Sequence, residues 1–391
     1  MRHPNLSATD REEENSHRNL SSCLRSVIGR IWQLIVTILQ QFVCCPNYGE
    51  EYVPRREEPR AFAKPEARLL VVGASDTGKS TFMRQMRLEF GDQYPVQERR
   101  RHQPHIRRNV MDSIHKLVSA AAQYEYSYST PEVESIAMKF AEWPPLEDLL
   151  EAPDLDPSWS DSIESLWKDP AIQAAYQRRN EFHLMTNADY FIAHAPRILQ
   201  EDYVPTIDDI LRMRIVTRGA VTKTYELTNI RMTLHDMGGQ RPERIAWVNQ
   251  LDYPSAILFV ASLSEYDQTV EEAEESKNRV QESLDIYEQL LGYSPFDTTP
   301  VILLLNKSDV FSVKIKEQPL KKYFPEYEGP DGDEASGRDY ITSLYVDLTK
   351  KYKKNLLVRY TEATNRDNFR AIFAFVSNYV SRTIMGLGGL Y

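Results

Sequence analysis

Cysteine is scarce in this sequence. Its 391 residues include three cysteines, Cys23, Cys44 and Cys45, and all of them precede the first predicted domain. A disulfide framework is therefore not expected to support the fold. This cysteine usage suits a protein of a reducing cytosol.

Positive charge is also in short supply. The chain has 47 Lys and Arg residues against 57 Asp and Glu residues, which gives a net charge of −10. Because no basic surplus is present to contact phosphate backbones, nucleic acid is not expected as a main partner. The eight histidines are scattered without metal-ligand spacing, so no zinc site is expected. The chain begins with polar and charged residues, so no signal peptide is expected.

A long apolar run is missing as well. Apolar residues recur at helical spacing from Leu24 to Phe42, but several glutamines and a threonine interrupt them. A membrane span needs about 20 predominantly apolar residues, and this helix is too short and too polar for one. Because Cys44 and Cys45 follow directly, we expect an interfacial helix anchored by two S-acylated cysteines. The alternative is a helix that packs on another protein and carries inert thiols. Position 2 is not glycine, which excludes N-myristoylation.

The strongest motif is G-x-x-x-x-G-K-S at Gly73–Ser80. An apolar run, Arg68–Val72, precedes it and predicts a buried parallel strand, and a helical pattern at Thr81–Phe90 follows it. In this context backbone N–H groups and the helix N-terminus converge on phosphate. Lys79 is expected to reach the β- and γ-phosphates, and the Ser80 hydroxyl to bind Mg²⁺. The predicted phosphate-binding residues of this loop are Gly73, Ser75, Asp76, Thr77, Gly78, Lys79, Ser80 and Thr81.

Three shorter motifs follow in chain order. In Asp236–Gln240, the Asp is expected to hold Mg²⁺ at a strand end, Gly239 to reach the γ-phosphate, and Gln240 to orient an attacking water. Asn306–Asp309 has the N-K-x-D pattern that recognises guanine, because a carboxylate accepts hydrogen bonds that adenine cannot offer. In Thr361–Thr364, the Ala363 N–H is expected to reach guanine O6. The predicted guanine-binding residues are Asn306, Lys307, Asp309, Ala363 and Thr364.

The elements between these motifs predict the fold class. Strand-type runs occur before Gly73 and at five later places, and helical stretches separate most of them. This alternation predicts an α/β fold with a six-stranded, mostly parallel sheet and helices on both faces. The later runs are Ala220–Leu227, Ile230–His235, Ala256–Ser262, Val301–Leu305 and Leu356–Tyr360, and the main helical stretches are Thr269–Leu291 and Asn368–Ile384. The acidic segment Glu326–Asp339 is expected to be a solvated loop.

Residues 92–207 have a different character. They contain almost no strand-type runs, and one helical stripe extends from Ile106 to Ala121. Shorter helices are expected at Pro131–Glu142, Leu146–Leu150, Ser160–Lys168, Ala171–Asn180 and Asn187–Ala193. This region is therefore predicted to be an all-helical module inserted into the α/β domain.

With these motifs in place, the chain resembles a heterotrimeric G-protein α subunit. The resemblance covers roughly residues 65–391 and includes Leu211–Thr217, Asp236–Glu243, Asn278-Arg279 and Phe324–Pro330. It implies a Ras-like GTPase domain at 65–91 and 208–391, with an inserted helical domain at 92–207. Residues 1–64 would form a disordered arm, an amphipathic helix and a linker.

The resemblance implies a switch that binds GTP or GDP with Mg²⁺ and hydrolyses GTP. Arg214 would be the arginine finger, and Gln240 would place the water. Thr217, Ser80 and Asp236 would hold Mg²⁺. Gly239 would contact the γ-phosphate and order the segment Gly238–Trp247.

The implied partners are a G-protein-coupled receptor at the C-terminal helix and an unidentified effector. The N-terminal helix would hold the chain at the cytoplasmic face of the plasma membrane. A βγ dimer is also implied, but Ile245-Ala246 stands where the family usually has two lysines, which weakens that expectation. The tail also lacks the Cys that some members carry four residues from the end, so ADP-ribosylation there is not expected.

Three further departures from the family pattern carry expectations. Ser75 stands where the family has Gly and is expected to slow hydrolysis, although a small side chain could also be tolerated. Thr186-Asn187 replaces an Asp-Ser pair, which would leave Lys307 without an acidic partner and speed GDP release. Glu362 replaces a Cys and is expected to face solvent.

Three alternatives remain at this stage. One is a membrane-attached GTPase with slow hydrolysis that forms no trimer with βγ. Another is an ATP-dependent P-loop enzyme, which the N-K-x-D motif disfavours. The third is a nucleotide-dependent scaffold that does not hydrolyse its ligand.

Overall fold

The computed structural model describes residues 64–142, 159–215, 217, 219–239, 254–270 and 277–386, all within one compact unit, Ala63–Tyr391. Several predictions made from the sequence lie outside this described part. They concern the N-terminal arm and helix, Cys44 and Cys45, the helix at Leu146–Leu150, Gln240, and most of the segment Gly238–Trp247. Within the described residues, no helix is both long and apolar enough to cross a membrane.

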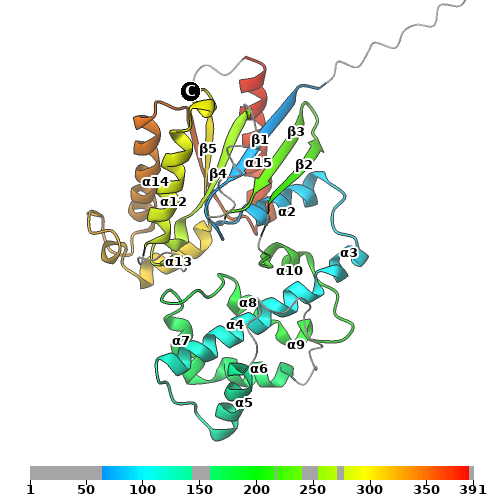
Figure 1. Cartoon of the computed structure of the whole chain (residues 1–391), viewed down its shortest axis with the longest axis vertical. Helices are drawn as coiled ribbons and strands as arrows, with labels where there is room; N and C mark the ends of the chain where they lie inside the picture. The colour runs from blue at the N-terminus through cyan, green and yellow to red at the C-terminus, as the bar shows by residue number, and fades with distance from the viewer. Residues whose placement is uncertain are drawn as a thin grey trace, which may run out of the picture. The chain divides into compact units, whose positions relative to one another are not determined.

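The described part contains one six-stranded sheet, as predicted, and its strand order is β2-β3-β1-β4-β5-β6 (Figure 1). Neighbouring strands are parallel except for the edge strand β2, which runs antiparallel to β3. The strands are β1 (Glu66–Val72), β2 (Ala220–Glu226), β3 (Arg231–Met237), β4 (Ala256–Ser262), β5 (Val301–Asn306) and β6 (Leu356–Thr361). Because the five parallel strands β3, β1, β4, β5 and β6 end at one edge, the motifs at their ends are brought together there.

Alternation of side chains along the central strands gives the sheet two buried faces. On β1, Leu70 and Val72 join one hydrophobic cluster, while Leu69 and Val71 join another. All six residues of β5 are buried, as expected for a strand covered on both sides.

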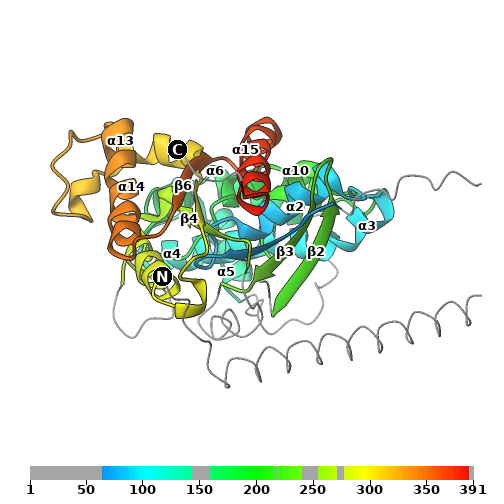
Figure 2. The ribbon, with the colours of Figure 1, turned by 90° about the horizontal axis from the view of Figure 1, so that it is seen from above.

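Helices cover both faces (Figure 2). One cluster includes residues of α12 (Arg279–Leu291), α13 (Ser308–Glu317) and α14 (Glu334–Lys351). The other includes residues of α2 (Lys79–Phe90) and α15 (Arg366–Ile384). The helix that begins in the predicted phosphate loop and the last helix of the described part therefore share one face of the sheet.

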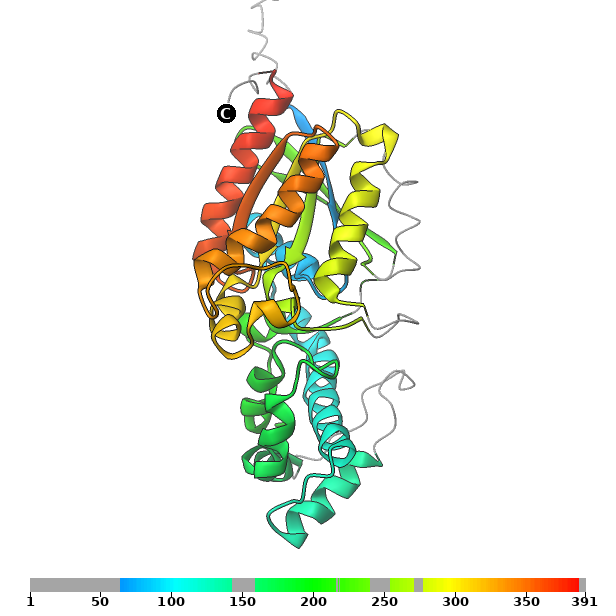
Figure 3. The same cartoon turned by 90° about the vertical axis from the view of Figure 1, so that its left-hand side faces the viewer.

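The helices between α2 and β2 pack mainly on one another (Figure 3). Their core is a third cluster that includes Ile106, Val110, Phe140 and Phe191. The helices are α3 (Val96–Arg101), α4 (Gln103–Gln123), α5 (Pro131–Ala141), α6 (Trp159–Lys168), α7 (Pro170–Gln177), α8 (Ala188–Ala193), α9 (Ala195–Ile198) and α10 (Ile207–Arg212). We call this set the helical region. Its long helix α4 matches the predicted stripe.

Two predicted boundaries were wrong. The helix expected at Thr269–Leu291 begins at Arg279, because the Asn278 side chain caps it and Thr269 instead bridges to Asn278. The loop expected at Glu326–Asp339 gives way to helix α14 at Glu334, where Asp333 supplies the cap. Helices α3, α9, α10, α13 and α14 were not predicted, and short 3₁₀ turns also occur at Leu263–Glu265, Ser294–Phe296 and Leu320–Lys322.

Candidate functional site

The phosphate-loop motif turns sharply between β1 and α2, and two glycines allow it. Gly73 has φ +145°, and a Cβ there would lie 2.1 Å from the Val260 carbonyl oxygen. Gly78 has φ +106°, and a Cβ there would lie 2.1 Å from Asn306 Nδ2. Both backbone conformations strain any other residue, and neither site has room for a side chain.

The Lys79 ammonium folds back over the loop. Lys79 Nζ donates to the Gly73 carbonyl at 2.9 Å and to the Ala74 carbonyl at 2.6 Å. Gly239 approaches from the end of β3, and a Cβ on it would lie 2.5 Å from Lys79 Nζ. The structure therefore brings the lysine and the glycine together, as expected if both contact the same phosphate.

The three predicted Mg²⁺ ligands come from three different segments. Ser80 Oγ lies 2.9 Å from Thr217 Oγ1. Asp236 lies within β3 rather than after it and is 4% exposed. Among the described residues, its Oδ1 has no hydrogen-bond partner. Burial raises the pKa of Asp236 to about 6, against the attraction of Lys79 and Arg84. A buried carboxylate oxygen without a partner fits a cation, so these residues suit Mg²⁺.

The predicted guanine-binding segments are joined to the phosphate loop by one side chain. Asn306 Nδ2 donates to the Thr77 carbonyl at 2.8 Å, and Asn306 Oδ1 accepts from the Ala363 N–H at 3.0 Å. Gln85 of α2 adds a second link, because its Nε2 donates to the Ala363 carbonyl at 2.9 Å. Three loops that are distant in sequence are thus held in one arrangement.

A single pocket collects most of the predicted residues. Of the predicted residues that the structure describes, all but Gly73, Thr77 and Asp236 line it. Those lining residues are Ser75, Asp76, Gly78, Lys79, Ser80, Thr81, Arg214, Thr217, Gly239, Asn306, Lys307, Asp309, Ala363 and Thr364. Arg84 and Arg212 also line it and had no predicted role.

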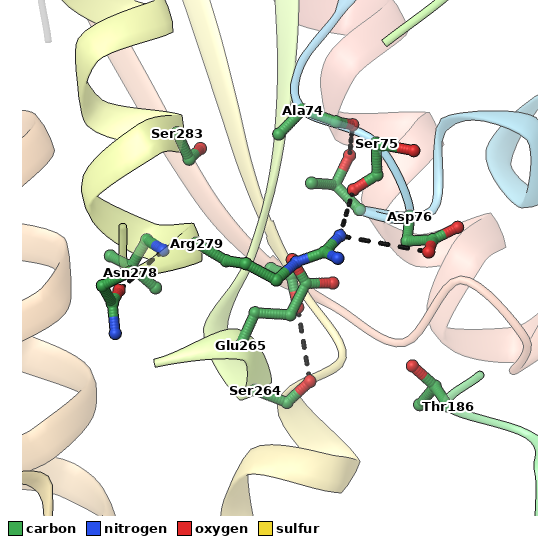
Figure 4. A network of polar contacts seen from close by, with 12 residues as sticks. Ala74, Ser75, Asp76, Thr186, Ser264, Glu265, Asn278, Arg279 and Ser283 are labelled. Atoms are coloured by element: carbon green, nitrogen blue, oxygen red, sulfur yellow. Dashed lines mark hydrogen bonds and ion pairs between the residues drawn. The ribbon is translucent and has the colours of Figure 1, made fainter. Parts of the chain in front are cut away.

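Behind the pocket lies a buried charge network (Figure 4). Arg279 Nη2 donates to the Ser75 carbonyl at 2.8 Å, and its Nε donates to Glu265 Oε2 at 3.0 Å. The other oxygen of Glu265 accepts from Lys307 Nζ at 2.8 Å. Burial opposes ionisation of Glu265, but Arg279 and Lys307 outweigh it and lower its pKa to about 2. The network therefore connects the phosphate loop to the lysine of the guanine motif.

This network corrects one expectation. Lys307 does not lack an acidic partner, because Glu265 supplies one. Lys307 Nζ also donates to Thr186 Oγ1 at 3.0 Å, so the position that lost its carboxylate still contacts the lysine through a hydroxyl. Glu362 is partly exposed, and its Oε2 accepts from Asn365 Nδ2 at 3.1 Å.

The predicted catalytic arginine lies against the phosphate loop. Arg214 Nη2 is 2.9 Å from Asp76 Oδ2. Burial opposes ionisation of Asp76, but the charges of Arg214, Arg279 and Lys307 outweigh it and lower its pKa. Gln240, its predicted partner in catalysis, lies outside the described residues.

Two residues with clear positional roles escaped the sequence analysis. Glu265 follows the buried strand β4, and a charged residue so close to a strand end was a usable signal. Asn109 lies in the middle of helix α4, where its amide binds the backbone of Arg214. No motif marks that contact, because its two partners are far apart in sequence.

Comparisons with known proteins agree with this geometry. A family model described as "G-protein alpha subunit" matches residues 51–380. The guanine nucleotide-binding protein subunit alpha-15 of Oryctolagus cuniculus is 33% identical over 341 residues, which cover 83% of this chain and 88% of that protein.

Proposed function

The chain belongs to the G-protein alpha subunit family. We propose that it is a Mg²⁺-dependent switch that stays active until its bound GTP is hydrolysed. Its guanine nucleotide binding, its GTPase activity and its part in G-protein signalling follow from the family. The observation that best supports the proposed site is the pocket in which Lys79, Arg214 and Asp309 all meet.

Each predicted residue has a distinct proposed task. Lys79 and the loop N–H groups bind the phosphates, while Asp309 recognises guanine. The Ala363 N–H, which was predicted to reach guanine O6, donates to Asn306 Oδ1 in the structure and would have to turn toward the base to bind it. Arg214 stabilises negative charge on the transferring phosphoryl group, and Gln240 orients the attacking water.

The metal ion has its own set of proposed ligands. Ser80, Thr217 and Asp236 would hold Mg²⁺, which supplies positive charge at the phosphate oxygens. Two observations support this assignment: the Ser80 and Thr217 hydroxyls lie close together, and Asp236 Oδ1 has no hydrogen-bond partner in the described part of the chain.

The proposed partners extend the family function. The C-terminal helix would face a G-protein-coupled receptor. An amphipathic N-terminal helix with acylated Cys44 and Cys45 would hold the chain at the cytoplasmic face of the plasma membrane. Ile245-Ala246 in the predicted switch segment leaves a second candidate: a membrane-attached GTPase with slow hydrolysis that forms no trimer with βγ. Co-purification with βγ in GDP and in GTP-analogue buffer distinguishes the two.

Thermal melting tests nucleotide choice. GTP with Mg²⁺ should raise the melting temperature, and ATP at the same concentration should not, because a ligand stabilises only the state that binds it. Equal protection by ATP would overturn the guanine assignment.

Phosphate release tests the catalytic assignment. The Arg214→Ala variant should bind GTP but hydrolyse it about 10³-fold more slowly than the unaltered chain.

A change in Trp247 fluorescence between GDP and a GTP analogue would report the switch, whereas an unchanged signal would contradict it.

A further inference from the structure

One side chain of the helical region holds the backbone of Arg214 on both sides. Asn109 Oδ1 accepts from the Arg214 N–H at 2.8 Å, and Asn109 Nδ2 donates to the Arg214 carbonyl at 3.1 Å. We infer that Asn109 is a positioning residue for the Arg214 guanidinium, so that the helical region directly sets the rate of GTP hydrolysis. This inference rests on the proposed role of Arg214.

Asn109 is itself firmly placed. It lies in the middle of α4, is 7% exposed and is flanked by core residues such as Ile106 and Val110. Both the Nδ2 and the Oδ1 of its side chain bond to the backbone of one residue outside its own helix. A buried amide that pairs with both polar groups of one residue fixes that residue in position and orientation.

The segment before Arg214 is held in the same way. Helix α10 ends at Arg212, so its last carbonyls have no partner inside the helix. Side chains donate to the last two carbonyls of α10 and to the next two along the chain, and they come alternately from α2 and from the helical region. Thr81 donates to Leu211 O at 3.2 Å, Asn187 to Arg212 O at 3.2 Å, Arg84 to Met213 O at 2.7 Å, and Asn109 to Arg214 O.

The segment is therefore anchored to two parts of the structure at once. Thr81 and Arg84 belong to the helix that starts in the phosphate loop, whereas Asn109 and Asn187 belong to the helical region. The Arg214 guanidinium already reaches Asp76 of the phosphate loop. A displacement of about 1 Å at a catalytic group can cost about 100-fold in rate, so the anchor on the Arg214 peptide itself should matter most.

Single-turnover hydrolysis of bound GTP tests the inference. Asn109→Ala should slow hydrolysis about 10- to 100-fold, because the guanidinium is no longer held on target. Its affinity for a non-hydrolysable GTP analogue should stay within about twofold of the unaltered chain, since Asn109 does not line the pocket. Asn109→Asp keeps the side-chain volume but loses the donor, and it should also be slow. It serves as the second variant if the alanine variant folds poorly.

Gln173→Ala is the matched control. Gln173 is another amide of the helical region whose Nε2 donates to a backbone carbonyl, that of Trp167, away from the pocket. Its loss should leave the hydrolysis rate unchanged. Equal slowing by both variants would mean that loss of stability in the helical region, not positioning, controls the rate.

A double variant isolates the pair. If Asn109 acts through Arg214, then Asn109→Ala combined with Arg214→Ala should hydrolyse GTP no more slowly than Arg214→Ala alone. Multiplicative losses, or an unchanged rate in Asn109→Ala, overturn the inference. An unaltered chain that does not hydrolyse GTP at all would instead overturn the proposed function.

Discussion

At the scale of single residues, Glu265 is a buried carboxylate that pairs with two cations. Its carboxylate is 3% exposed and accepts from Arg279 through one oxygen and from Lys307 through the other. A buried carboxylate is stable when its cations remain in place, and removing one member of such a group leaves buried charge uncompensated.

Glu265→Gln should therefore lower the free energy of unfolding of the nucleotide-free chain by about 3 kcal/mol at pH 7. The folded pKa of about 2 lies below the ordinary value of 4.5, so the carboxylate stabilises the fold above pH 4.5 and loses this effect as pH falls toward 2. Urea unfolding at pH 7 and at about pH 3.5 should show a smaller deficit at the lower pH. An equal deficit at both would contradict this linkage.

Ser75 carries the second prediction at this scale. Its carbonyl is held by Arg279, and its side chain lines the pocket near the predicted catalytic groups. If the side chain crowds the transition state, Ser75→Gly should speed single-turnover GTP hydrolysis several-fold and leave GTP-analogue affinity unchanged. A constant rate would show that serine is tolerated.

At the scale of elements, helices α2 and α15 are joined by ion pairs. Glu89 of α2 accepts from Arg366 Nη2 at 2.9 Å and from Arg370 Nε at 2.7 Å. The Glu89 side chain is 11% exposed. Burial opposes its ionisation, but hydrogen bonds from Arg370 and Arg366 outweigh it and lower its pKa. The contact links the helix of the phosphate loop to the proposed receptor helix.

Glu89→Gln should release GDP several-fold faster, because α15 and the Ala363 loop before it would be less firmly held to α2. Fluorescent GDP measures the rate, and added salt should narrow the difference between variant and unaltered chain. Asp347→Asn, which breaks an exposed pair with Lys350, is the control and should have no effect. Equal release rates in all three proteins would show that the ion pairs do not restrain the nucleotide.

Elements also show what sequence reasoning can reach. The buried strands and the Gly-rich turn follow from local pattern, so β4 was predicted to the residue. The start of α12 was missed because no glycine or proline interrupts Thr269–Lys277, and the helix start is set by the Asn278 cap. Asn109 and Glu265 could not be assigned roles, because their partners are distant in sequence and their contacts depend on the finished fold.

At the scale of the whole described part, the sheet and the helical region keep separate hydrophobic cores. Polar contacts cross between them. Besides the contact between Lys307 and Thr186, Arg179 lies 3.6 Å from Glu317 and Asn180 Nδ2 donates to Tyr323 Oη at 3.3 Å. Contacts of this kind restrain opening without burying much apolar surface, which suits a cleft that must release its ligand.

Thr186→Asp should slow GDP release, because a carboxylate there would add an ion pair with Lys307 to the hydrogen bond that the hydroxyl already makes. The effect should be smaller than for a lysine with no other partner, since Glu265 already holds it. Ser165→Asp adds the same charge at an exposed site of the helical region and serves as the control. Release that is equally slow in both variants would point to net charge, and unchanged release would refute the contact.

The side chain of Asn306 has a consequence for how the two ends of a nucleotide are sensed. One amide ties Thr77 of the phosphate loop to Ala363 of the base loop. When guanosine and pyrophosphate are added as separate fragments, each fragment alone bears the free-energy cost of ordering both loops. The intact nucleotide bears that cost once. The combined binding free energies of the fragments should therefore fall short of that of the intact nucleotide by more than the entropy of linking them.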